Sequence, residues 1–180
     1  KAVKFGEGPM GKQKSNLFLT NFKKLNLDCL FIVGGDGTLQ IANRFFEMGL
    51  PVIGIPKTID NDLKGTDYSF GFHTAVQVAC DALDRLQTTG RSHDRVMILE
   101  VMGRDSGWIA LESGISGGAH IILIPEIPYQ LDKVLEKIRK REAGGSPYTI
   151  IVVAEAAFEA GGEKITTENA SERLQGVKRY

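Results

Sequence analysis

The fold is decided by residues 28–38, which read DCLFIVGGDGT. Residues 28–33 form a short apolar run. A strand that is covered on both faces needs no polar alternation, so this run predicts a buried strand. Residues 38–48 place apolar side chains, Phe45 and Phe46 among them, on one face, which predicts a helix that stops at Gly49. The stretch therefore indicates a strand that passes through a glycine-rich turn into a helix.

The same alternation continues along the chain. Further strands are predicted over residues 51–55, 96–101, 121–124 and 149–154, and further helices over residues 73–89, 106–115 and 131–141. Pro56 is expected to end the second strand. Alternating strands and helices predict an α/β fold, with a mostly parallel sheet between helices on both faces. No element is predicted in the first 20 residues, and the segment from Gly161 to Tyr180 is polar and ill-defined.

Composition excludes several classes of protein. Lys and Arg together number 22, as do Asp and Glu, which argues against a strongly basic nucleic-acid face or a polybasic membrane patch. The 180 residues fit one domain better than two. No apolar run has the length of a membrane span, and no secretory signal is expected. Cys29 and Cys80 are interpreted as two buried free thiols, which fits a cytoplasmic location.

In parallel sheets ligands bind beyond the carboxyl ends of the strands, so the strand exits are the places to search for a site. The first exit is Gly34-Gly35-Asp36-Gly37-Thr38. Glycines and a helix N-terminus favour a phosphate, but the Asp36 carboxylate would repel one. A Mg²⁺ ion that bridges the carboxylate and the phosphate would remove this conflict. The alternative is a tight turn in which Asp36 caps the helix.

The second exit, residues 56–62, reads PKTIDND. Asp60 and Asp62 are two residues apart, so in an extended segment they share a side. A positioned Asp can accept the proton of an attacking hydroxyl, and Lys57 can neutralise charge that develops on a phosphate. The alternative is a surface turn rich in Asp and Asn.

The third exit carries Arg104, whose guanidinium can hold a sugar phosphate. The alternative is a surface Arg paired with Asp105. Arg95 begins the same strand and so lies at the opposite edge of the sheet, from which it could reach a neighbouring subunit's site. Glu155, at the end of the last strand, can accept hydrogen bonds from sugar hydroxyls, or it is a solvated strand end.

Four motifs in this order resemble the 6-phosphofructokinase family, which uses ATP or pyrophosphate. They are GGDGT (34–38), PKTIDNDLKGTDY (56–68), SHDR (92–95) and EVMGR (100–104). The resemblance covers residues 28–163 and implies a three-layer, Rossmann-like phosphofructokinase fold. It implies that residues 1–180 are the central part of a subunit, with a donor-site lobe over about 1–70 and a sugar-phosphate lobe over about 71–163.

The resemblance also implies a role for each matching residue. Asp36 would hold Mg²⁺, and Gly34, Gly35, Gly37 and Thr38 would join it around the phosphoryl donor. Asp60 would be the base on the sugar 1-hydroxyl, assisted in catalysis by Lys57, Thr58 and Arg104. The residues around fructose 6-phosphate would be Thr58, Asp60, Asp62, Met102, Gly103, Arg104 and Glu155. Arg95 would reach the 6-phosphate from an adjacent subunit of a homodimer or homotetramer.

The donor predicted here is ATP, because Gly37 leaves open the region that an Asp would fill in typical pyrophosphate users, while Lys57 is compatible with either donor. Pyrophosphate is the alternative. Further alternatives are a lipid or NAD kinase that shares the GGDGT loop, and a non-catalytic sugar-phosphate-binding subunit. Two features of the family are absent: a glycine-rich loop ahead of these motifs, and the later Arg and His residues of the sugar-phosphate site. The basic and acidic residues of the bacterial effector pocket are also replaced, by Gly144, Gly145, Ser146 and His120, which argues against bacterial-type control by ADP or phosphoenolpyruvate.

Overall fold

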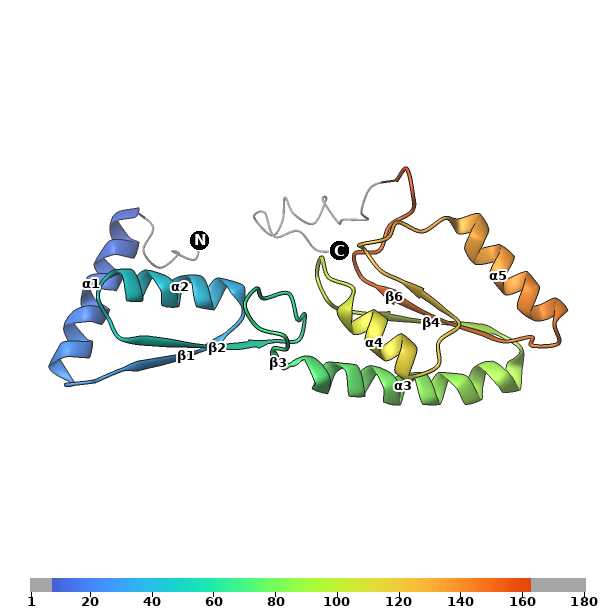
Figure 1. Cartoon of the computed structure of the whole chain (residues 1–180), viewed down its shortest axis with the longest axis horizontal. Coiled ribbons are helices and arrows are strands. Elements are labelled where there is room, and N and C mark those ends of the chain that lie inside the picture. The colour runs from blue at the N-terminus through green and yellow to red at the C-terminus, as the bar shows by residue number, and fades with distance from the viewer. Residues whose placement is uncertain (1–7, 163–180) are drawn as a thin grey trace. The chain divides into compact units, whose positions relative to one another are not determined.

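The computed structural model describes residues 8–162, with side chains from residue 14 onward. The described residues form two compact units (Figure 1). The first unit runs to Thr58 and includes Leu63–Ser69, and the second contains Ile59–Asp62 and the chain from Phe70 onward. The polar segment from Gly161 to Tyr180 lies almost entirely outside the described residues.

The first unit places two helices against a pair of parallel strands. Its elements are α1 (Gly8–Lys24), β1 (Leu30–Gly34), α2 (Asp36–Glu47) and β2 (Val52–Thr58). The β1–β2 register runs from Leu30 opposite Val52 to Gly34 opposite Pro56. Phe22, Phe45 and Leu50 are buried between the helices and one face of these strands. The opposite face, with Phe31 at 62% exposure, is open in the described residues, so this unit has two layers.

Three details of the first unit differ from the sequence-based predictions. Helix α1 was not predicted, because its glycines and proline have low helix propensity. The helix is stabilised by packing instead, with the ring of Phe18 stacked 4.4 Å from that of Phe45. Strand β2 continues through Pro56, where its pairing with β1 ends. Phe46 is 63% exposed, so the buried face of α2 is narrower than predicted.

The second unit is a three-layer α/β structure. Its elements are β3 (Phe70–Gly71), α3 (Phe72–His93), β4 (Val96–Val101), α4 (Trp108–Ser116), β5 (Ile121–Leu123), α5 (Leu131–Ala143) and β6 (Thr149–Ala154). The strands β4, β6 and β5 form a parallel sheet in that order. Although β6 is the last described strand, it lies between β4 and β5, so both of its edges are paired, and its side chains Ile150 and Val152 are fully buried.

Helices α3 and α4 cover one face of this sheet, where Leu83 and Ala110 pack with Ile150 and Val152 (Figure 1). Helix α5 faces the other side of the sheet, next to a cavity lined by Leu131, Val134 and Ile151. The predicted α/β fold class is thus confirmed. The described strands form two sheets, where the sequence had suggested one, and the pairs β1–β2, β4–β6 and β5–β6 are parallel.

The two cysteines are free, as predicted, but both are half-buried and not buried. The Cys80 Sγ lies 3.8 Å from the carbonyl oxygen of Ser113. Burial, and after it the carboxylates of Asp84 and Asp81, raise the pKa of the Cys80 thiol, so it stays protonated at neutral pH. Among the described residues, no helix combines the length and the apolar character that a membrane crossing needs.

Candidate active site

The glycine-rich exit lies where β1 meets α2. Gly34 is the last residue of β1, Gly35 precedes the helix with an extended backbone (φ −84°, ψ −168°), and α2 begins at Asp36. A Cβ on Gly34 would lie 2.5 Å from the Cβ of Thr38, so only glycine lets Thr38 fold back against the strand. The first N–H groups of a helix have no intrahelical acceptor. This exit therefore presents backbone donors of the kind that bind phosphate.

Asp36 is the first residue of α2, and the helix N-cap is Gly35, so the alternative in which Asp36 caps the helix is wrong. The carboxylate is exposed, and its Oδ2 accepts a 2.8 Å hydrogen bond from the amide of Gln40. Mg²⁺ is commonly bound by one or two carboxylates together with substrate phosphates. A single exposed Asp beside a phosphate-type turn fits that pattern. Among the described residues, no group of three or more acidic, His or Cys side chains forms a metal cage.

The end of β2 lies beside the glycine-rich exit. A Cβ on Gly35 would stand 3.6 Å from the Cβ of Thr58 and 3.7 Å from the carbonyl oxygen of Lys57. The Lys57 side chain is exposed. The carbonyl of Thr58 accepts a hydrogen bond of 2.9 Å from the Ser69 hydroxyl, which holds the returning loop against the strand. The first unit thus brings Gly34–Thr38, Lys57 and Thr58 together at one edge.

Asp60 and Asp62 belong to the second unit and have different surroundings. Asp60 is 8% exposed, and its carbonyl accepts a 3.2 Å hydrogen bond from the hydroxyl of Ser106. Asn61 between them adopts a left-handed backbone with φ +52°, and Asp62 is exposed. The prediction of an extended segment with both carboxylates on one side is therefore wrong. Asn tolerates the left-handed conformation better than most residues, which explains the turn at this position.

The loop after β4 is joined to the end of β6. Oε1 of Glu155 accepts hydrogen bonds from the backbone N–H groups of Gly103 (3.1 Å) and Arg104 (2.7 Å). Arg104 has φ +54°, which is uncommon for a long side chain, and both Arg104 and Met102 are exposed. The structure thus brings Met102, Gly103, Arg104 and Glu155 together.

Arg95 lies at the other end of the same strand, as the predicted strand boundaries required. It precedes the six-residue strand β4, and its carbonyl accepts a hydrogen bond from the N–H of Thr149 at the start of β6. At ~3.3 Å per strand residue, the backbones of Arg95 and Met102 are roughly 23 Å apart. Arg95 therefore does not share the edge of the sheet that carries Arg104.

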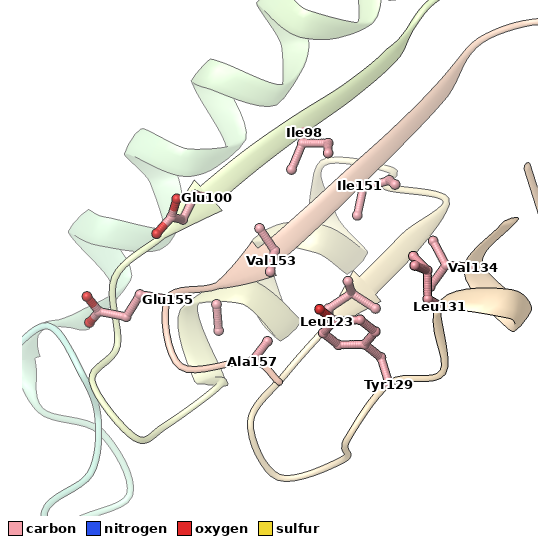
Figure 2. Close-up of a pocket in the computed structure, with 11 residues that line it drawn as sticks. Ile98, Glu100, Leu123, Tyr129, Leu131, Val134, Ile151, Val153, Glu155 and Ala157 are labelled. Atoms are coloured by element: carbon pink, nitrogen blue, oxygen red, sulfur yellow. The ribbon is translucent and has the colours of Figure 1, made fainter. Parts of the chain in front are cut away.

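A cavity of about 420 Å³ lies under α5 in the second unit. Figure 2 shows Glu155 and Glu100 at one side of it, with Leu131 and Val134 opposite the strand residues Ile151 and Val153. Its lining is mainly aliphatic, which does not suit a charged sugar phosphate.

His120 is hydrogen-bonded to strand β6 in this chain. The backbone N–H of His120 donates to the carbonyl of Ile150 (2.9 Å), and the ring Nδ1 of His120 accepts the backbone N–H of Ile150 (2.8 Å), so this Nδ1 is unprotonated. Burial, followed by the positive charges of Arg141 and Lys137, lowers the pKa of His120. An acidic effector ligand at this position would find a neutral ring already bonded to the sheet.

Two residues at the edge that carries Arg104 were not identified from the sequence. Ser106 binds the Asp60 carbonyl, and Oε1 of Glu126 accepts a 2.8 Å hydrogen bond from the N–H of Gly107 ahead of α4. Residues 125 and 126 follow the fourth predicted strand, so the strand-exit rule applies to Glu126. Nothing in the sequence indicated that its partner would be a backbone amide.

Comparison with known proteins supports the resemblance. A phosphofructokinase family profile matches residues 6–179. The chain is 55% identical over 157 residues to the ATP-dependent 6-phosphofructokinase 2 of Clostridium perfringens, covering 87% of this chain and 43% of that protein. It is 56% identical to the ATP-dependent 6-phosphofructokinase of Chloroflexus aggregans, over 86% of this chain and 43% of that protein.

Solved structures of phosphofructokinases also match this chain. Phosphofructokinase from Saccharomyces cerevisiae matches with a TM-score of 0.81 and 28% identity, over 97% of this chain and 26% of that one. The pyrophosphate-dependent phosphofructokinase from Marinobacter aquaeolei matches with a TM-score of 0.70 and 31% identity, over 82% of this chain and 41% of that one. The chain thus spans less than half the length of these relatives. On the family profile and these identities, the chain belongs to the phosphofructokinase family.

Proposed function

We propose that this chain supplies catalytic and binding groups to an ATP-dependent 6-phosphofructokinase. The enzyme transfers the terminal phosphoryl group of ATP to the 1-hydroxyl of fructose 6-phosphate, giving fructose 1,6-bisphosphate in glycolysis. The observation that carries the proposal is the edge of the first unit, where the Gly34–Thr38 turn lies beside Lys57 and Thr58 at the start of α2. The names of the relatives at 55% and 56% identity support ATP as the donor.

The donor end of the reaction uses the first unit. The N–H groups at the start of α2 bind the donor phosphates, and Lys57 neutralises charge that develops on the transferring group. Thr58 donates a hydroxyl hydrogen bond to the same group. Asp36 would hold Mg²⁺, which when bound supplies positive charge to the donor phosphates.

The acceptor end uses the second unit. Asp60 takes the proton from the attacking 1-hydroxyl, and its low exposure favours a directed proton transfer over exchange with water. The exposed Arg104 binds the sugar phosphate, with Asp62, Met102, Gly103 and Glu155 completing the sugar site. Transfer between two fixed groups depends mainly on positioning and electrostatics.

Arg95 has a separate role. Because it lies at the opposite end of β4, we assign it to the 6-phosphate in a neighbouring subunit's site, in a homo-oligomeric cytoplasmic enzyme. Two free thiols in the described chain fit a reducing compartment. Mixing an Arg95→Ala subunit with an Asp60→Asn subunit tests this role. If the sites are shared, the mixture regains activity that neither variant has alone, and no recovery argues against the assignment.

The proposed function is tested by steady-state assays of a complete subunit containing this chain, with each donor and with a panel of acceptors. We expect turnover of fructose 6-phosphate with ATP. Turnover with pyrophosphate and none with ATP would instead indicate a pyrophosphate-dependent phosphofructokinase, which is the activity in the name of the Marinobacter aquaeolei relative. Phosphorylation of diacylglycerol or NAD but not of the sugar, or sugar-phosphate binding without turnover, would reject the proposal.

A further inference from the structure

The loop from Met102 to Gly107 in the second unit is held by two side chains from other segments, Glu126 and Glu155, and by one side chain of its own, Ser106. Glu155 accepts the N–H groups of Gly103 and Arg104 at 3.1 and 2.7 Å. Glu126 accepts the N–H of Gly107 at 2.8 Å. Ser106 donates its hydroxyl to the carbonyl of Asp60 at 3.2 Å.

The backbone of this loop needs such support. Arg104 has φ +54° and Gly103 has φ +145°, and residues in sparsely populated conformations persist only where their surroundings impose them. A Cβ on Gly103 would collide with the carbonyl oxygen of Ser106, and a Cβ on Gly107 would lie 2.6 Å from Oε2 of Glu126. The loop backbone thus packs closely against its own Ser106 carbonyl at Gly103 and against the Glu126 carboxylate at Gly107.

We propose that Glu126 and Glu155 form a carboxylate clamp that positions Arg104 for the sugar phosphate, while Ser106 ties the same loop to the backbone of Asp60. This inference rests on the proposed function. Both carboxylates act through backbone amides, so Glu126 is a positioning residue that need not touch substrate. The hydrogen bonds are charge-assisted, which makes them stronger than bonds between neutral groups. Movement of the loop would shift Arg104 and Asp60 together.

The first test measures the loop itself in this chain. Trypsin cleaves after Arg104 when the loop opens. We compare the rate of cleavage after Arg104 in the unaltered chain with the rate at the same bond in three variants. The variants are Glu126→Gln, Glu155→Ala and the control Glu142→Gln, which changes an exposed carboxylate on α5. Loss of a charge-assisted bond should speed cleavage by about tenfold in the two clamp variants and leave the control unchanged. Equal rates in all four proteins would overturn the clamp, whatever the activity of the enzyme.

The second test separates positioning from simple loss of stability. In a complete subunit containing this chain, Glu126→Gln should raise KM for fructose 6-phosphate by about tenfold and leave KM for ATP unchanged. If Glu126 were only structural, the variant would lower the active fraction, so kcat would fall with both KM values unchanged. That outcome would overturn the positioning role.

The proposed function and the carboxylate clamp can each be rejected without rejecting the other. A complete subunit that does not phosphorylate fructose 6-phosphate rejects the proposed function, while the cleavage rates still decide whether the carboxylates hold the loop. If Glu155→Ala does not fold, amide exchange in the unaltered chain decides instead. The amides of Gly103, Arg104 and Gly107 should exchange at least about tenfold more slowly than free peptide amides, and exchange at the free-peptide rate would overturn the clamp.

Discussion

Replacing Gly37 with Asp should separate ATP binding from folding, because the structure predicts opposite effects on the two. Gly37 is the second residue of α2, and a Cβ added there meets no atom within 4 Å. Asp has a helix propensity only a few tenths of a kcal/mol better than that of Gly, and a carboxylate near a helix N-terminus adds about 0.3–1 kcal/mol. Repulsion from Asp36 offsets part of this gain. We therefore expect the free energy of unfolding to stay the same or to rise by up to about 1 kcal/mol.

Donor binding should change in the opposite direction. Two unit charges 4–8 Å apart repel each other by about 2–4 kcal/mol at an effective dielectric constant of about 20. A carboxylate at position 37 would stand beside the phosphates of ATP, so kcat/KM for ATP should fall by roughly 30- to 1000-fold. The assay follows product formation from fructose 6-phosphate with ATP or pyrophosphate, and urea unfolding gives the stability.

The matched control is Asn43→Asp, which adds the same charge to α2 six residues further along. At 1.5 Å per residue it lies about 9 Å further from the donor site than position 37, close to the Debye length at 0.1 M salt, so its effect on kcat/KM for ATP should be clearly smaller than that of Gly37→Asp. Because Asn43 also donates a 2.8 Å hydrogen bond to Glu47, this variant serves as a control for ATP kinetics and not for stability. A Gly37→Asp enzyme that keeps its kcat/KM for ATP to within threefold would refute the reasoning. So would a loss of stability, because the observed open space around Gly37 would then not describe the folded chain.

Three further predictions concern the second unit. Asp60→Asn should lower kcat by about 10²–10⁴-fold in a complete subunit that still folds, and unchanged turnover would remove Asp60 as the base. Leu83→Ala, at a fully buried position, should cost about 2–5 kcal/mol in urea unfolding, whereas Ile115→Ala, at a position 68% exposed, should cost little, and equal losses would contradict the packing described here. The folded state disfavours the charged form of His120, so the unfolded chain binds more protons and stability should fall as pH drops below about 6.5 towards the lowered folded pKa. His120→Asn should reduce this slope, as thermal melts between pH 5 and 8 would show, and an unchanged slope would contradict the prediction.

Much of the fold could be predicted because apolar runs and strand exits are local features. Strands β4 and β6 begin and end where the sequence predicts. For β6 the reason is that a buried parallel strand leaves a nearly continuous apolar run. The helix α1 escaped prediction because glycine and proline obscure a helix that is stabilised mainly by Phe18 and Phe22 packing on another segment.

The candidate site likewise has residues that the sequence indicated and contacts that only the fold creates. Residue type and order along the chain sufficed to indicate the Gly34–Thr38 turn, Asp60 and Arg104 as candidates, because each follows directly from a predicted strand. The backbone partners of Glu126, Glu155 and Ser106 lie 19, 51–52 and 46 residues away along the chain, and only the fold brings them within hydrogen-bond distance. Local sequence specifies which groups are present, whereas hydrogen bonds between distant segments depend on how the strands pair, and that pairing is a property of the whole sheet.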